Sequence, residues 1–315
     1  MTIAHPPESA HVRIVEVGPR DGLQNEATPI ATADKARFIA LLADAGLREI
    51  ETTSFVSPKT IPQLADADEL MARLDRRPGV RYSVLVPNVR GLERAEAAGA
   101  DAIAVFSAAT DAFTERNIGL TIEESLAAFA PVLARAAELG WWRRGYVSTA
   151  FGCPYAGAVE PSAAVEVALR LLDLDVDEVC FGDTIGVAVP SQVTELTQDA
   201  MGMGIPADRL AYHFHDTRGT ALANVVAALG VGVRCFDSST GGTGGCPYAP
   251  GAAGNLATED LVYLLDGLGY KHGVRLEGVL GAARFIAGVL GRPLTSKVGR
   301  AGGWDPATGR PIGSA

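Results

Sequence analysis

The chain has few cysteines, and the four that it has are widely spaced, at Cys153, Cys180, Cys235 and Cys246. No two of them form the CxxC spacing that is typical of structural zinc sites and redox pairs. A disulfide framework is also disfavoured, because small disulfide-stabilised domains carry many cysteines at short spacings. We therefore expect reduced thiols.

Positive charge is scarce as well. The 27 Lys and Arg residues face 37 Asp and Glu residues, which gives a net charge of −10. No basic stripe offsets this repulsion, so we expect no nucleic-acid partner. No apolar run reaches the ~18 residues that a membrane span needs, so we expect no membrane partner. The amino-terminal segment MTIAHPPESAHV has neither a signal-peptide nor a transit-peptide pattern, and a cytoplasmic location is the expectation.

Apolar residues are abundant, at 48%, and they recur in short β-type runs separated by amphipathic helical stretches. The run starts lie roughly 31 residues apart on average, near the size of one βα unit. Eight such alternations predict an α/β fold, a (β/α)8 TIM barrel, with a doubly wound open sheet as the competing architecture. The expected strands begin at Arg13, Glu49, Tyr82, Ala102, Arg144, Asp177, Leu210 and Val233.

The carboxyl-terminal part departs from this alternation. An additional helical segment is expected over residues 276–291, after the eighth unit, where it could cover one rim of the barrel. The last stretch, GRAGGWDPATGRPIGSA, is rich in Gly and Pro and lacks periodicity. We therefore predict a single barrel domain over residues 1–298 and a mobile or partner-dependent tail over residues 299–315.

Polar residues gather after several predicted strands, at the end of a barrel where active sites lie. Arg20 and Asp21 follow strand one, and such a pair is by default a structural ion pair. His213 and His215 stand two residues apart on strand seven and therefore project to the same face. Two imidazoles in this arrangement form half of a metal site, although two hydrogen-bonded core histidines are the competing interpretation.

Three further segments carry candidate groups. The glycine-rich stretch over residues 241–255 carries Cys246 and Asn255, and it suits a loop that closes over a substrate better than it matches any phosphate-binding motif. Asp183 and Thr184 follow strand six. Glu51, on strand two, either contacts a ligand or metal-bound water in the barrel mouth or is a buried structural carboxylate paired with Arg20.

Asp21, His213, His215 and Asn255 together provide two oxygen and two nitrogen ligands. This mixture needs no thiolate and suits a divalent cation, Mg²⁺ or Mn²⁺, better than zinc.

Several long strings, in the order found, resemble the hydroxymethylglutaryl-CoA (HMG-CoA) lyase family of the metallolyase superfamily of TIM barrels. They are EVGPRDGLQNE, ETTSFVSPK, GCPYAG, GDTIG, the HxHDT segment, GGCPYAPGAAGN and NLATEDLVYLLDGLG. The resemblance covers residues 12–298. It implies cleavage of 3-hydroxy-3-methylglutaryl-CoA to acetyl-CoA and acetoacetate, a step of leucine catabolism and ketone-body metabolism, by a homodimer.

The resemblance also implies roles for residues. It assigns the divalent cation to Asp21, His213, His215 and Asn255, and it makes Arg20 and Cys246 catalytic. Arg20 suits the thioester oxygen that gains negative charge, and Cys246 the proton donor to the departing acetyl-CoA carbanion. The acceptor of the hydroxyl proton stays open between Asp21, His213 and Glu51 acting through a water. The acyl-CoA substrate is expected to contact Arg20, Gln24, Asp183 and Thr184.

The phosphates of the acyl-CoA need positive charge, for which Lys59, Lys297 and Arg300 are candidates by chemistry alone.

Three alternative functions stay open. A lyase for a longer 3-hydroxy-3-alkylglutaryl-CoA would use the same chemistry in a roomier pocket, since each methylene is discriminated by only ~1–3 kcal/mol. A condensing enzyme of the same superfamily is expected to carry additional carboxyl-terminal sequence. A catalytically silent binding barrel would need none of the reactive groups.

Overall fold

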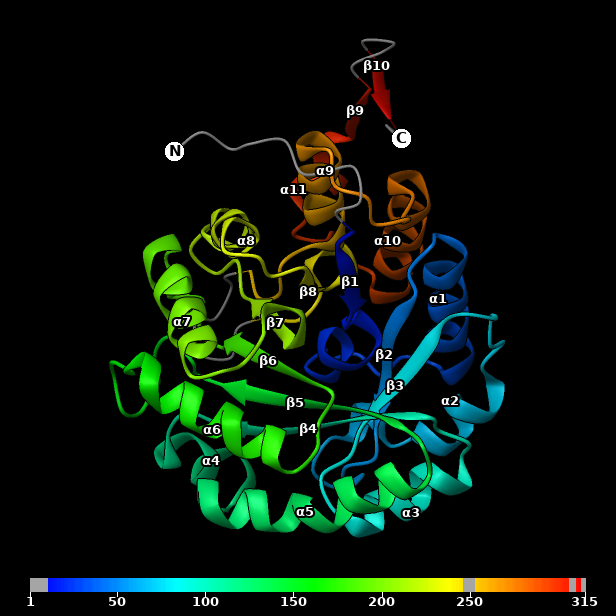
Figure 1. Cartoon of the computed structure of the whole chain (residues 1–315). Coiled ribbons are helices and arrows are strands. Elements are labelled where there is room, and N and C mark those ends of the chain that lie inside the picture. Colours follow the sequence, from blue (N-terminus) through cyan, green and yellow to red (C-terminus); the bar gives the residue numbers. More distant parts are fainter. Residues whose placement is uncertain (1–10, 246–252, 306–309, 313–315) are drawn as a thin grey trace.

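The computed structural model describes residues 11–245, 253–305 and 310–312. Within them, eight parallel strands pair in sequence order, and the last pairs with the first to close a barrel (Figure 1). The predicted (β/α)8 barrel is confirmed, and an open doubly wound sheet is wrong because that sheet has two unpaired edges. The strands are β1 Arg13–Glu16, β2 Glu49–Ser54, β3 Arg81–Leu85, β4 Ala102–Ala108, β5 Trp142–Ser148, β6 Glu178–Asp183, β7 Leu210–Phe214 and β8 Cys235–Ser238.

Helices surround the barrel and connect its successive strands (Figure 1). They are α1 Thr32–Asp44, α2 Ala67–Arg73, α3 Val89–Ala97, α4 Asp111–Ile118, α5 Ile122–Glu138, α6 Pro161–Asp173, α7 Pro190–Gly202, α8 Ala221–Gly230 and α9 Thr258–Leu268. The shorter turns are η1 Gly18–Gly22, η2 Pro62–Leu64, η3 Ala207–Arg209 and η4 Thr240–Gly242. The long helix α5 begins at a capping box, in which Thr121 and Glu124 each accept a hydrogen bond from the other's backbone N–H.

The predicted additional helix is present as α10, Leu276–Leu290, which packs against α1, α9 and η4. Beyond it come α11, Lys297–Ala301, and two short antiparallel strands, β9 Gly303–Asp305 and β10 Arg310–Ile312. These strands lie past α9 and α10, away from the barrel (Figure 1), and Trp304 on β9 is 53% exposed. The division into a barrel domain over residues 1–298 and a tail over residues 299–315 stays a prediction.

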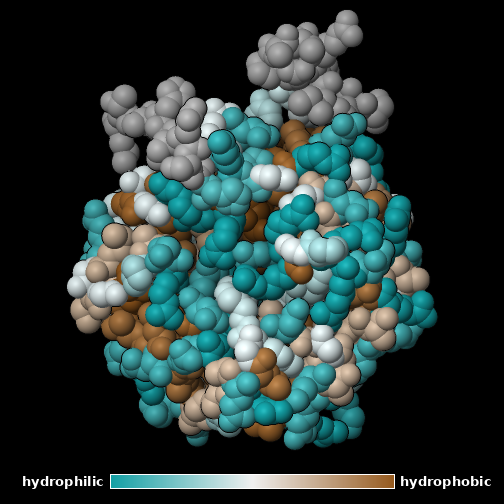
Figure 2. All heavy atoms as spheres, turned by 45° about the vertical axis from the view of Figure 1, so that its right-hand side comes forward, coloured by the Kyte–Doolittle hydropathy of each residue, from teal (hydrophilic) through white to brown (hydrophobic). Residues whose placement is uncertain are grey.

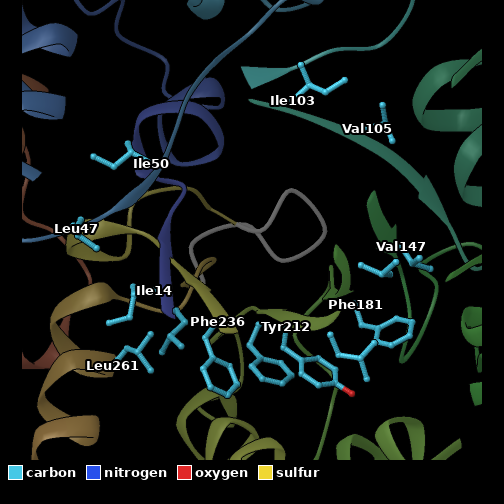
Figure 3. Packing of buried hydrophobic residues seen from close by; sticks show 14 of the residues in the cluster. Ile14, Leu47, Ile50, Ile103, Val105, Val147, Phe181, Tyr212, Phe236 and Leu261 are labelled. Carbon is cyan, nitrogen blue, oxygen red and sulfur yellow. The ribbon is translucent and has the colours of Figure 1, made fainter. Parts of the chain in front are cut away.

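Side chains on the barrel strands alternate between an outer and an inner layer. The outer layer packs the sheet against the helices, and Figure 3 shows Phe181, Tyr212 and Phe236 in a row across β6, β7 and β8. The rings of Phe181 and Tyr212 lie 5.9 Å apart. The inner layer is smaller, with a separate apolar cluster that contains residues such as Val15 and Cys180.

Charged side chains complete the inner layer. Arg144 on β5 is 2% exposed, and it forms ion pairs with Glu178 on β6 at 3.0 Å and with Asp237 on β8 at 2.7 Å. Glu178 also pairs with Arg13 on β1, which contacts Glu49 on β2 at 2.9 Å. A charge inside a protein is tolerated only when it is paired. These side chains can be buried because positive and negative groups alternate, so that each charge has a neighbour of opposite sign.

None of the described helices is long and apolar enough to cross a membrane. On the face drawn in Figure 2, hydrophilic residues predominate and apolar residues lie in separate patches. Thiols are free at each cysteine that the structure describes, Cys153, Cys180 and Cys235.

Replacement of Phe236 by Ala should lower the free energy of unfolding by about 3–5 kcal/mol, because the ring is fully buried between sheet and helices and its loss leaves a cavity. Met203→Ala, at a position 63% exposed, is the control and should change it by less than about 0.5 kcal/mol. Urea unfolding followed by circular dichroism measures both. A Phe236→Ala protein that unfolds at the wild-type urea concentration would contradict this packing.

Candidate active site

A cavity of about 280 Å³ opens at the carboxyl ends of the barrel strands. Its lining includes Arg20 and Asp21 after β1, Phe106 on β4, Tyr146 on β5 and His213 on β7. These segments are far apart in sequence and meet because parallel strands in a barrel all end at the same rim. The polar residues that follow strands one and seven thus share one cavity, as the sequence predicted.

Arg20 is oriented by two carboxylates. It lies in η1 directly after β1, 8% exposed, and its Nε donates to Glu51 Oε2 at 2.7 Å while Nη2 lies 2.6 Å from the same oxygen. Its Nη1 donates to Asp21 Oδ1 at 2.8 Å. Glu51 is therefore the buried partner of Arg20, one of the two alternatives that the sequence left open. Burial raises the pKa of Glu51, and the adjacent guanidinium opposes that shift.

Asp21, His213 and His215 form a cluster whose ligand atoms lie within 4.8 Å of one another. Burial raises the pKa of Asp21, but the charges of Arg20 and His213 and a hydrogen bond from Asn255 outweigh it and bring the pKa to about 2. Burial and the neighbouring His213 lower the pKa of His215 to about 3. At neutral pH the cluster thus contains a carboxylate and a neutral imidazole, the forms that bind metal ions.

Asn255 joins the cluster through the returning arm of the glycine-rich stretch. A β-bridge places it beside His215, and its Nδ2 donates to Asp21 Oδ2 at 2.8 Å and to the Thr243 carbonyl at 3.1 Å. The other arm passes close by at Gly244, whose φ is +89°. A Cβ atom there would lie 2.6 Å from Asn255 Nδ2 and 3.2 Å from Gly22 Cα, so only glycine fits.

The donor set fits a divalent cation. Among the described residues, two buried atoms of the cluster have no hydrogen-bond partner, Nδ1 of His215 and Oδ1 of Asn255. Buried polar atoms are rarely left unsatisfied unless an ion or water completes them. With a carboxylate oxygen and imidazole nitrogens, these atoms suit a hard or borderline divalent ion.

The expected substrate contacts divide into two groups. Gln24 and Thr184 line the cavity, where Gln24 donates to Asp21 Oδ1 at 3.1 Å and Thr184 Oγ1 accepts from the Thr149 N–H at 2.8 Å. Asp183 is 1% exposed and does not line it. Its carboxylate accepts the backbone N–H groups of residues 187 and 188, and burial raises its pKa to about 6.

Cys246, the expected proton donor, lies outside the residues that the structure describes.

The three candidate phosphate contacts do not line the cavity. Lys59 and Arg300 are exposed, and Lys297 pairs with Asp216, next to His215. Their contacts with the acyl-CoA stay predictions.

Sequence reasoning missed Asp237, which lies directly behind the cluster. Its Oδ2 is 3.1 Å from His213 Nδ1, and it is 1% exposed. This hydrogen bond and the charge of Asp237 raise the pKa of His213 against the effect of burial. A signal was present, because Asp237, Arg144 and Glu178 are charged residues within expected barrel strands, where buried charges persist only if they pair.

A parallel barrel with a buried arginine and a carboxylate–imidazole cluster in one mouth defines a metal-dependent barrel enzyme. Residues 11–286 match the HMGL-like family. The chain belongs to this family.

Individual relatives agree with this assignment. The chain is 50% identical to a hydroxymethylglutaryl-CoA lyase of Pseudomonas mevalonii over 92% of its length and 96% of that protein. A crystal structure of the Pseudomonas aeruginosa hydroxymethylglutaryl-CoA lyase superposes with a TM-score of 0.90 at 48% identity, covering 93% of this chain and 97% of that one. An HMG-CoA lyase from Acinetobacter baumannii, solved with coenzyme A and 3-methylmalate, has a TM-score of 0.88 at 35% identity, covering 93% and 95%.

Replacement of Gly244 by Ala should weaken Mn²⁺ binding by about tenfold or more, because the added methyl group displaces Asn255 and η1 from the cluster. Gly245→Ala is the matched control, since no described atom outside its two chain neighbours lies within 4 Å of a Cβ placed there. Isothermal titration of both proteins with Mn²⁺ gives the comparison. Equal affinities in the two variants would show that Gly244 does not shape the cluster.

Proposed function

We propose that the chain cleaves 3-hydroxy-3-methylglutaryl-CoA to acetyl-CoA and acetoacetate. The observation that carries this proposal is that Arg20 and the Asp21–His213–His215 cluster face one cavity. Relatives named hydroxymethylglutaryl-CoA lyases, about half identical over nearly the whole chain, support the same reaction. Coenzyme A and 3-methylmalate in the Acinetobacter baumannii structure support an acyl-CoA substrate with a small branched acid.

Asp21, His213, His215 and Asn255 would hold the divalent cation, Mg²⁺ or Mn²⁺. When bound, such a cation supplies Lewis acidity that lowers the pKa of a substrate hydroxyl. The imidazoles favour Mn²⁺, and the carboxylate and amide oxygens suit both ions. The Asp21 carboxylate is suited to the ligand role by its pKa of about 2, which keeps it ionised and makes it a weak base.

Arg20 would stabilise the negative charge that develops on the thioester oxygen as the C2–C3 bond breaks. A guanidinium has five N–H donors. In Arg20, Nε and Nη2 contact Glu51 and Nη1 contacts Asp21, and these contacts fix the plane of the guanidinium. One N–H bond on Nη1 and one on Nη2 stay available to a substrate. A donor held in place before the reaction needs no reorganisation when charge develops, which is the basis of its catalytic effect.

Proton transfer needs an acceptor for the hydroxyl proton and a donor to the product carbanion. Asp21, His213 and Glu51 through a water are the proposed acceptors, and the low pKa of Asp21 disfavours it among the three. Cys246 is the proposed donor on the strength of the family likeness. Gln24 and Thr184 are proposed to contact the substrate from the cavity wall, with Asp183 holding the turn that presents Thr184.

A longer 3-hydroxy-3-alkylglutaryl-CoA is the alternative substrate. Apolar side chains of the cavity wall, such as Leu85 and Phe106, provide a surface against which a larger alkyl group could pack. A condensing reaction and a silent binding barrel have less support, because the lyase relatives align along almost their whole length and the reactive groups are intact.

A homodimer and a cytoplasmic location complete the proposal. The dimer rests on the family likeness, and light scattering at twice the chain mass of 32.7 kDa would support it. A Rattus norvegicus relative, 48% identical, is named a cytoplasmic 3-hydroxy-3-methylglutaryl-CoA lyase, which supports the location.

Purified protein supplied with Mg²⁺ or Mn²⁺ should release acetoacetate from HMG-CoA and should lose this activity when EDTA removes the metal. A 3-ethyl analogue measured alongside separates the two candidate substrates through the ratio of kcat/KM. Absence of cleavage of either compound after metal is restored would refute the lyase function.

Arg20→Gln should lower kcat by about 10²–10³, the usual effect of losing one oxyanion donor, and leave Mn²⁺ affinity within about threefold. The neutral amide keeps polarity at the site but loses the positive charge that stabilises the developing enolate. Steady-state turnover and Mn²⁺ titration are measured on the same preparation. A kcat within about threefold of wild type would exclude the proposed role.

A further inference from the structure

Asp237 connects the cation cluster to the charged interior of the barrel. It lies on β8, directly opposite His213 in the register of the two strands. Both side chains face the barrel interior, where Asp237 Oδ2 lies 3.1 Å from His213 Nδ1. On the cluster side, Nε2 of His213 lies 4.0 Å from Asp21 Oδ2. The imidazole therefore stands between two carboxylates, one on each ring nitrogen.

We propose that Asp237 is a positioning residue that fixes the tautomer and ring orientation of His213 and thereby sets the affinity of the cluster for its divalent cation. A carboxylate can only accept a hydrogen bond from the ring, so Nδ1 must carry the proton. The lone pair is then on Nε2, which lies 4.0 Å from Asp21 Oδ2. The proposal rests on the cation site of the proposed function and concerns how this chain prepares that site before any ion binds.

The two histidines of the cluster differ in this respect. His215 Nδ1 is buried and has no hydrogen-bond partner among the described residues, so no described carboxylate orients the ring through that nitrogen. The ring centroids are 5.2 Å apart, close enough for a rotated His213 to change the space at His215. Fixing one ring therefore restricts the geometry of the pair.

Arg144 holds Asp237 in place from the opposite side. Its Nη1 forms an ion pair at 2.7 Å with Asp237 Oδ1, the oxygen that does not contact His213, so the ion pair and the imidazole contact involve different oxygens of the carboxylate. Arg144 is held in turn by Glu178 at 3.0 Å, and its Nη1 donates to the Tyr146 hydroxyl at 3.0 Å. The series reaches Arg13 at the amino end of β1. The carboxylate that orients His213 thus cannot turn without breaking a buried ion pair.

If Asp237 served only as one of the two counter-charges of Arg144, removing either counter-charge would change the Mn²⁺ affinity equally. Glu178 is the other counter-charge, is equally buried, and does not contact the cluster. Glu178→Gln is therefore the matched control for Asp237→Asn, because each variant removes one negative charge from Arg144 and only one of them alters the partner of His213.

Asp237→Asn should weaken Mn²⁺ binding by about 10–100-fold, the usual effect of removing the carboxylate behind a histidine ligand, and Glu178→Gln should stay within about threefold of wild type. Isothermal titration measures the affinities, with circular dichroism as a check of folding. Wild-type Mn²⁺ affinity in Asp237→Asn, or an equal loss in both variants, overturns the positioning role.

A second measurement is made on the wild-type protein and uses a variant only to assign one signal. In metal-free wild-type protein labelled with ¹⁵N-histidine, at an alkaline pH where the imidazole is neutral, the ring nitrogens of His213 should show one tautomer, protonated at Nδ1, with the signal assigned by its absence in His213→Asn. A tautomer protonated at Nε2 overturns the proposal. Failure of the wild-type protein to cleave HMG-CoA would instead count against the proposed function, since this spectrum is recorded without substrate.

Discussion

The ion pairs inside the barrel are the interaction on which the rest of this site depends. Arg144 is almost fully buried, and it is tolerated there because Glu178 and Asp237 neutralise it from two sides. Removing one member of such a buried set leaves an unpaired charge, which typically costs about 3–5 kcal/mol. The barrel interior therefore contains a series of paired charges, and Asp237, at one end of that series, contacts a histidine of the cation cluster.

The rim of the barrel uses this rigid base in two ways. The short turn after β1 places Arg20 and Asp21 side by side, and Glu51 on the neighbouring strand fixes the guanidinium. The glycine-rich stretch after β8 returns to β7 and brings Asn255 beside His215. The two segments meet at Gly244, where any side chain would separate them. The groups that must cooperate in C–C cleavage are thus held by strands and tight turns, which favours catalysis through preorganised charge.

Much of this could be predicted from the sequence. The eight alternations of apolar strand and amphipathic helix predicted the barrel, since these periods follow from local geometry and from the need to bury apolar faces. The grouping of Arg20, Asp21, His213 and His215 was predicted too, because all parallel strands of a barrel end at one rim. The sequence did not predict Asp237 and Arg144 as parts of the site, since which interior charges pair depends on strand register and tilt.

By itself, then, the sequence determined the fold class, the family and the polar residues of the cation cluster, because those follow from periodicity and from strings of residues that stand together in the chain. Tertiary structure paired Glu51 with Arg20 and left the buried Asp183 out of the cavity lining. It also decided which nitrogen of His213 faces the cluster. The physical reason is that these outcomes depend on distances of a few ångströms between side chains from different strands, and no pattern along one strand records them.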